Sequence, residues 1–274
     1  MVKPEGFIQT ANPLEVLFQA HEQGKILSVQ VTSLDYPDNQ PTWVLAFPGL
    51  DGVRGLVPRG ETGLDGYGDT HALMQRFVGQ VVNVKIKGLD RENGLAACSR
   101  REAVDEMREK VLESLNEGQV IDCLVRAVLP RADGKPPRLL VDAGGGVLVE
   151  IPRKKAAVRL AVPLQQQYRP GQPVKARVLR VDARLGQAEL SIRDALPDPW
   201  ERADFRRGAT AACTVVTVQS GIVFLEPDSC PGVTGIAPAP LVGELSRGNR
   251  VTAVVATFDR GAHKLRFRLR GRLA

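Results

Sequence analysis

The chain has 274 residues, 43% of them hydrophobic and 25% charged, and carries a formal net charge of +6. These proportions exclude wholesale disorder, and the length fits two or three globular domains, of which three is our working number. No apolar run approaches the roughly 20 residues that span a bilayer, so no membrane partner is expected. The first ten residues lack the pattern of an export signal, which predicts a cytoplasmic location.

The positive charge is concentrated near one end of the chain. Residues 205–274 contain ten Lys and Arg against four Asp and Glu, whereas the remainder is balanced at 27 against 27. A localised basic surplus indicates an anionic partner, with RNA or DNA as the first hypothesis and a membrane surface as the second. A solvated face without a partner is the remaining alternative.

The first predicted element is a short helix over residues 13–23, with Leu14, Leu17 and Phe18 packing inward. A β-rich run follows at 26–34, and similar runs occur at 120–129 and 210–218, each after a glycine. Further strands are predicted at 43–47 and 55–58, at 139–143 and 147–151, and at 222–225 and 233–236. The glycines at 144–146 are interpreted as a hairpin turn rather than a phosphate-binding loop.

One closing pattern occurs three times. It reads GQVVNVKIKGLD at 79–90, GQPVKARVLRVD at 171–182 and GNRVTAVVATFD at 248–259. In each copy an apolar residue follows the final Asp by eight positions and an arginine by eleven. The alternation of Val82, Val84 and Ile86 with polar residues has the period of a half-buried strand, so the pattern predicts a β-hairpin. Three copies of it indicate three structural repeats of five strands each.

The segments between the repeats differ in character. Residues 102–116 place apolar side chains at helical spacing and predict an amphipathic connector helix, whereas 196–204 is a proline-broken linker. The predicted fold is therefore all-β, with three tandem five-stranded barrels, a short N-terminal helix and a helical connector. Its predicted parts are the leader 1–23, the first repeat 24–101, the connector 102–117, the second repeat 118–195, the linker 196–204 and the basic third repeat 205–274.

These repeats resemble the S-one RNA-binding repeat, an OB-fold motif named after the largest protein of the bacterial small ribosomal subunit. The resemblance rests on GLVPRGE at 55–61, on the closing hairpin at 178–193 and on the DPWE linker at 198–201, and it covers about residues 24–272. It implies OB-fold barrels that bind single-stranded RNA, either mRNA or rRNA, in translation or RNA metabolism, with the ribosome as a wider partner. Single-stranded DNA stays open as a ligand.

Base stacking in such repeats uses exposed aromatic residues on the second strand. In the first repeat we predict stacking on Trp43 and Phe47, with Arg54 and Arg59 on phosphate. A core position for Trp43 is the alternative, although Val44 and Ala46 are the better candidates for the interior. The third repeat offers only Phe224, and the second has no aromatic residue in 139–151, so the second is interpreted as a spacer or a protein-docking barrel.

The final strand provides a further predicted phosphate contact. Lys264, Arg266, Arg268 and Arg270 alternate with apolar residues and therefore share one face. An edge strand protected from aggregation by its charges is the alternative. Arg153 and Lys154, after the third strand of the second repeat, are weaker candidates, with a solvated turn as an equal alternative.

The sequence contains no enzyme motif. The four cysteines form no CxxC pair, three histidines are scattered, and phosphate-loop, nucleophile-elbow and HExxH patterns are absent. We therefore expect no catalysis, no cofactor and no metal, and we interpret the cysteines as buried and reduced. The competing hypothesis is a protein-interaction adaptor whose degenerate OB repeats dock on the ribosome or on a nuclease.

Overall fold

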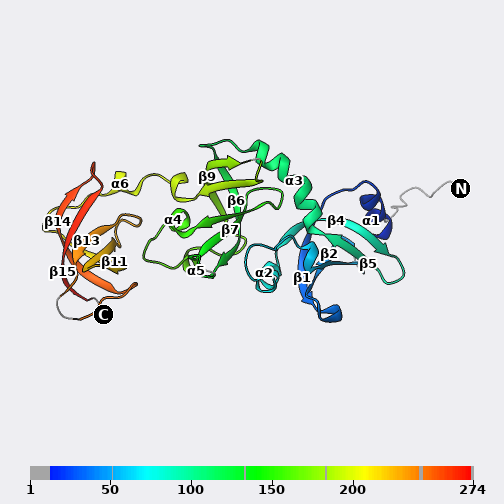
Figure 1. Ribbon diagram of the computed structural model, residues 1–274, viewed down its shortest axis with the longest axis horizontal. Helices are drawn as coiled ribbons and strands as arrows, with labels where there is room; N and C mark the ends of the chain where they lie inside the picture. The colour runs from blue at the N-terminus through cyan, green and yellow to red at the C-terminus, as the bar shows by residue number, and fades with distance from the viewer. Residues whose placement is uncertain (1–12, 51, 133, 183, 241–242, 273–274) are drawn as a thin grey trace, which may run out of the picture. The chain divides into compact units, whose positions relative to one another are not determined.

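A computed structural model describes residues 13–50, 52–132, 134–182, 184–240 and 243–272 (Figure 1). By its internal contacts the chain forms two compact units. One contains residues 1–116, 141–149 and 181–188, and the other contains residues 117–140, 150–180 and 189–274. Three five-stranded sheets, of which the first and third are closed barrels, confirm the predicted succession of three OB-fold repeats.

The first barrel is closed, with strand order β1-β2-β3-β5-β4. Its strands are β1 (Leu27–Asp35), β2 (Thr42–Ala46), β3 (Arg54–Pro58), β4 (Val81–Asp90) and β5 (Leu95–Ser99), and α2 (Thr70–Phe77) lies between β3 and β4 in the chain. The predicted alternation is confirmed on β4, where Val82, Val84 and Ile86 are buried. Inward side chains thus alternate with outward ones, as barrel closure requires.

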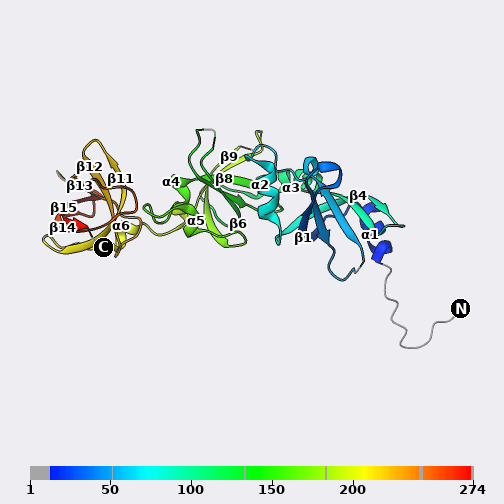
Figure 2. The same cartoon turned by 90° about the horizontal axis from the view of Figure 1, so that it is seen from below.

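Helix α1 (Pro13–Glu22) lies against β4, as Figure 2 shows. Leu17 is buried, as predicted, and the imidazole Nδ1 of His21 donates a hydrogen bond to the carbonyl oxygen of Ile86 (2.8 Å). The connector helix α3 (Arg100–Ser114) begins two residues before the predicted start. It begins there because the Ser99 hydroxyl caps it by accepting from the backbone N–H of Glu102 (3.0 Å).

The middle repeat has the same strand succession but an open sheet, in the order β10-β9-β6-β7-β8. Its elements are β6 (Val120–Leu129), β7 (Arg138–Asp142), β8 (Leu148–Pro152), α4 (Arg153–Ala156), α5 (Leu164–Gln167), β9 (Pro173–Asp182) and β10 (Gln187–Ser191). The predicted glycine turn is confirmed, since the Asp142 carboxylate accepts from the N–H groups of Gly144 (2.9 Å) and Gly146 (3.1 Å).

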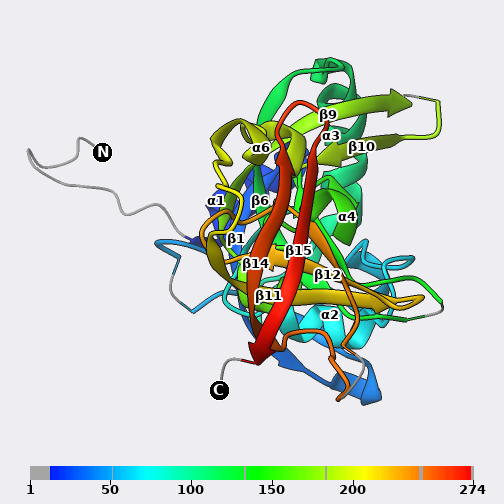
Figure 3. The same cartoon turned by 90° about the vertical axis from the view of Figure 1, so that its left-hand side faces the viewer.

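The third barrel is closed in the order β11-β12-β13-β15-β14. It comprises β11 (Thr210–Gln219), β12 (Ile222–Pro227), β13 (Gly235–Pro238), β14 (Arg250–Asp259) and β15 (Lys264–Arg272), and Figure 3 shows β15 running beside β14. Gly235 permits the tight core, because a Cβ there would lie 2.3 Å from the Phe267 ring. Any side chain at this position would displace a ring that is 2% exposed.

The segment predicted as a linker is packed into the third barrel from α6 (Pro199–Arg202) onward. Ala203 is fully buried in the barrel core, and the Arg260 guanidinium donates two hydrogen bonds to its carbonyl oxygen, from Nη2 (2.7 Å) and Nε (3.0 Å). The Trp200 ring stacks on that of His263, with centroids 5.0 Å apart and planes 6° apart. This part of the predicted linker therefore stabilises the turn between β14 and β15.

We expect Arg260→Ala to destabilise this turn by about 2 kcal/mol, because a buried carbonyl loses a charged donor. Amide hydrogen exchange of β14 and β15 in the full chain measures the effect. The control is Arg268→Ala, an exposed position on the same hairpin, which we expect to change stability by less than about 0.5 kcal/mol. Equal exchange rates in the two variants would contradict the role of Arg260.

Candidate nucleic-acid interface

A row of outward-facing residues crosses the third barrel from strand to strand. Thr217 on β11 pairs with Phe224, Phe224 with Ile236, and Ile236 with Arg266 on β15. Phe224 and Ile236 are half-buried and Arg266 is exposed. Because directly paired residues point to the same face of a sheet, an aromatic ring and a guanidinium share this face, separated by one aliphatic side chain.

The alternation predicted for the last strand is confirmed in the structure. Leu265 and Phe267 are each 2% exposed, whereas Lys264, Arg266, Arg268 and Arg270 are exposed. Within the described residues none of these four cations makes a hydrogen bond or an ion pair, so their charges are available to an external anion. They continue the row of Phe224 and Arg266 into a stripe along β15, which we call the basic stripe.

The same row in the first barrel has no ring and no charge. Val44 pairs with Leu56, and Leu56 with Ala97 on β5. Ala97 and Arg266 are equivalent, since each lies eighteen residues after the glycine of its repeat pattern, Gly79 or Gly248. In the second repeat the equivalent residue is Glu189, which forms an ion pair with Lys155. The third repeat thus carries a cation at a position that is uncharged in the first repeat and acidic in the second.

The predicted stacking role of Trp43 and Phe47 is wrong, because the structure buries both rings. Trp43 is 0% exposed, faces the interior opposite Val57, and donates from Nε1 to the Met74 carbonyl oxygen (2.9 Å). Phe47 is 5% exposed and contacts Gly55, where a Cβ would lie 3.1 Å from its ring. The inward positions are therefore 43, 45 and 47, rather than 44 and 46 as expected.

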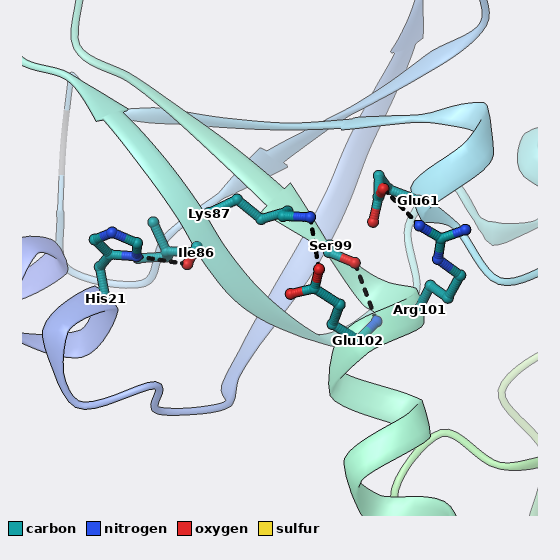
Figure 4. Close-up of polar contacts among 7 residues, drawn as sticks. All are labelled: His21, Glu61, Ile86, Lys87, Ser99, Arg101 and Glu102. Carbon is teal, nitrogen blue, oxygen red and sulfur yellow. Dashed lines mark hydrogen bonds and ion pairs between the residues drawn. The ribbon is translucent and has the colours of Figure 1, made fainter.

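The arginines predicted beside these rings are exposed. On β3 the side chain of Arg54 points outward, on the same face as that of Leu56. Arg59 directly follows the end of β3. Two other cations near the closing hairpin of the first barrel are paired with acids, as Figure 4 shows. Lys87 contacts Glu102 (2.6 Å), which raises the pKa of the lysine, and Arg101 contacts Glu61 (2.9 Å).

Arg101 and Arg270 are equivalent arginines in the repeat pattern, eleven residues past the final Asp. In the first barrel the guanidinium is held by Glu61, whereas in the third it has no ion pair among the described residues. The difference follows from sequence, since the third repeat contains few acids. At this equivalent position the positive charge is thus neutralised in the first repeat and left exposed in the third.

The two candidates after β8 have different environments. Arg153 is half-buried and donates from Nη2 to the carbonyl oxygens of Leu160 (2.7 Å) and Val162 (2.9 Å), so it holds its own loop. Lys154 is exposed. The structure therefore leaves Lys154 as the better phosphate candidate of the two.

The described residues show no cluster of three or more His, Cys, Asp and Glu that could hold a metal ion. The cysteines at 98, 123 and 213 are buried, and burial raises the pKa of Cys98 and of Cys213 to about 12. A thiol with such a pKa stays protonated and is a poor nucleophile near neutral pH.

No protein-family model matches the chain. In sequence it is 30% identical over 197 residues to small ribosomal subunit protein bS1 of Staphylococcus aureus strain COL, a match that covers 68% of this chain and 46% of that protein. The bS1 protein of Staphylococcus saprophyticus is also 30% identical, over 198 residues, with 68% and 45% covered. The chain spans about half the length of these curated relatives. The resemblance predicted from the repeats is thereby confirmed.

Two solved structures show weaker likeness. A multidomain protein with nucleic acid binding domains from Streptococcus pneumoniae is 13% identical with a TM-score of 0.26, and the match covers 92% of this chain and 75% of that one. The CSD456 segment of drosophila Unr is 15% identical with a TM-score of 0.19, and the match covers 56% of this chain and 62% of that one. Among the described residues, every helix is too short or too polar to cross a membrane.

Proposed function

We propose that this relative of bS1 binds single-stranded RNA chiefly through its third repeat. The observation that carries the proposal is the row that places the half-buried ring of Phe224 and the exposed guanidinium of Arg266 on one barrel face. Bases stack on Phe224, and phosphates follow the basic stripe. The surface of the second and third strands, on which Phe224 and Ile236 lie, is the one that OB folds commonly use for oligonucleotides.

Such a surface binds by two additive interactions. Stacking of a base on an aromatic ring contributes about 1–3 kcal/mol and tolerates any base, since every base has a π-face. Phosphate contacts add affinity that depends on salt and not on sequence. We infer affinity for mRNA or rRNA with weak sequence preference, and single-stranded DNA remains a candidate ligand.

The remaining predicted residues have secondary roles in this proposal. Arg54, Arg59 and Lys154 are exposed cations that contact phosphates of the bound RNA where it extends beyond the third repeat. We keep the predicted repeats 24–101 and 118–195 and extend the third repeat to begin near residue 198. We infer a non-enzymatic, cytoplasmic protein that acts in translation or RNA metabolism, with the ribosome as a wider partner.

The adaptor hypothesis remains the second candidate, and the first two repeats favour it. The outward row of the first barrel is uncharged, and the equivalent position in the second repeat is the acidic Glu189. These repeats would then dock on a protein surface while the third holds RNA. Recovery of the same partner before and after RNase treatment, with a chain that retains its fold, would favour docking over RNA-mediated association.

The first test is Phe224→Ala, measured by fluorescence anisotropy with labelled single-stranded RNA, single-stranded DNA and duplex RNA. We expect affinity for single strands to fall roughly 5- to 100-fold, corresponding to the loss of one stacked base. The matched control is Tyr36→Ala, because Tyr36 is 50% exposed but lies on the first repeat. Unchanged affinity in Phe224→Ala, or an equal loss in both variants, would contradict the assigned face.

A further inference from the structure

A hollow of about 320 Å³ lies beside the third barrel, bounded by the segment that enters α6, the loop that joins β12 to β13 and Val158 of the second repeat. Its lining includes Arg193, Leu196, Pro197 and Pro199 from the entering segment. Arg202 on α6 and Ser229 on the loop complete the polar part of the lining. None of the residues in this lining belongs to the Phe224 row or to the basic stripe.

Two guanidinium groups line this hollow without a carboxylate partner. The Arg202 guanidinium makes no hydrogen bond and no ion pair within the described part of the chain, and the Arg193 guanidinium makes one long hydrogen bond, to the Lys154 carbonyl oxygen (3.3 Å). No Asp or Glu lines the hollow. The buried Glu226 is nearby, but its oxygens accept from the N–H groups of Leu160, Ala161 and Gly232. The lining itself therefore carries two positive charges and no carboxylate, which suits it to an anion.

The remaining lining is largely apolar. The rings of Pro197 and Pro199 and the side chain of Leu196 offer a surface for a flat hydrophobic group, and the Ser229 hydroxyl can donate or accept one hydrogen bond. A site with apolar walls and a few polar groups is the usual arrangement for a small-molecule ligand, and its size is at the lower end of the typical range. One nucleotide, with a planar base and a phosphate, matches both the charge and the walls.

The walls are held in place by the fold before any ligand binds. The Cys230 thiol donates to the Pro199 carbonyl oxygen (3.5 Å), and the Asp198 carboxylate caps α6 by accepting from the Trp200 N–H (3.0 Å). The loop is fixed at Gly232, whose N–H donates to Glu226 (2.7 Å). A rigid site loses little conformational entropy on binding, so a small ligand can be retained.

We propose that this hollow binds a nucleoside monophosphate group, with the phosphate between Arg193 and Arg202 and the base against the proline rings. Two sources share this chemistry, namely a free nucleotide and the phosphorylated end of an RNA strand. The inference is independent of the proposed single-strand face, because the two sites have no residue in common. Loss of one site therefore leaves the other measurable.

The experiment uses the full chain and isothermal titration calorimetry with uridine monophosphate, adenosine monophosphate, uridine and inorganic phosphate. We expect saturable binding of both monophosphates and weaker binding of uridine and of phosphate, since each provides half of the contacts. Arg202→Gln should weaken monophosphate binding about tenfold or more through loss of a charged donor. The control Arg207→Gln removes the same charge from an exposed position outside the hollow and should leave binding unchanged. Phe224→Ala should also leave it unchanged.

A second arm distinguishes the two sources. Oligoribonucleotides with a 5′-phosphate, a 3′-phosphate or hydroxyl ends are compared in the Arg202→Gln and wild-type chains. A preference for one phosphorylated end that disappears in Arg202→Gln assigns the site to an RNA terminus, whereas monophosphate binding without such a preference assigns it to free nucleotides. The proposal is overturned if no monophosphate binds at low salt, or if Arg207→Gln weakens binding as much as Arg202→Gln.

Discussion

Trp43→Ala will lower the free energy of unfolding of the first barrel by about 3–5 kcal/mol, the cost of removing a large buried aromatic side chain. The residue is 0% exposed, its ring packs on Phe77 with centroids 5.4 Å apart, and its Nε1 hydrogen bond satisfies the carbonyl oxygen of Met74. Single-stranded RNA affinity of the folded protein should stay within about twofold, because the ring faces the barrel interior and not the bound strand.

The measurement must resolve one barrel at a time, since a chain of several repeats does not unfold in a single two-state transition. Hydrogen exchange of the β2 and β4 amides reports the first barrel, and the amides of β14 serve as the internal reference. Trp43→Phe is the conservative variant; it keeps an aromatic ring but loses the bond to Met74, which we expect to cost about 1–2 kcal/mol. If Trp43→Ala lowers RNA affinity while the first barrel keeps its native stability, the stacking role of Trp43 is correct after all.

The burial of Trp43 shows where the sequence pattern is insufficient. On β2 residues 42–45 are all buried, so the strand lacks the alternation that distinguishes an inward from an outward position. What decides the face is the pairing of Trp43 with Val57 and of Leu45 with Gly55, and this register depends on the loop between β2 and β3. The partner of the indole N–H, on α2, could not be identified from the sequence either.

The third repeat shows the opposite case. The strict alternation of cations with Leu265, Phe267 and Leu269 allowed the outward face of β15 to be predicted, because a strand has only two faces. The alignment of Phe224 with Arg266 through Ile236 was not predictable in the same way. It joins β12, β13 and β15, three strands whose relative positions are set by barrel closure. Local pattern thus determines a face, and long-range pairing determines which residues meet on it.

The segment before the third barrel, predicted as a linker, is partly packed into that barrel, and the sequence does not show this for a related reason. Its prolines correctly indicate a break between the second and third repeats, but they do not show that Ala203 enters the core or that Arg260 binds its carbonyl oxygen. The hydrogen bonds from Arg260 to Ala203 join positions 57 residues apart in the chain. Composition therefore identified the linker and could not reveal that part of it is structural.

Neutralising the basic stripe will produce the largest expected change in RNA affinity. In the variant Lys264→Gln, Arg266→Gln, Arg268→Gln and Arg270→Gln, four exposed cations that have no ion pair among the described residues lose their charge. Each phosphate contact contributes about 0.7 to the slope of log affinity against log salt for single strands, so the slope should flatten by about 2.8. Affinity at 0.1 M salt should fall by about two to three orders of magnitude. The fold should tolerate the change, since exposed substitutions usually alter stability by less than about 0.5 kcal/mol each.

The control variant distinguishes a localised stripe from the effect of net charge. It carries four Gln substitutions at exposed cations outside the third barrel: Lys25, Arg131, Lys135 and Arg184. Both variants lose the same charge, so long-range attraction is weakened by similar amounts and only contacts with phosphate differ. We expect the control to keep the salt slope within about 0.5 of wild type. If both variants flatten the slope equally, RNA is held by the general field of the protein, and the third repeat loses its assigned role. If only the stripe variant does so, the phosphates lie along β15.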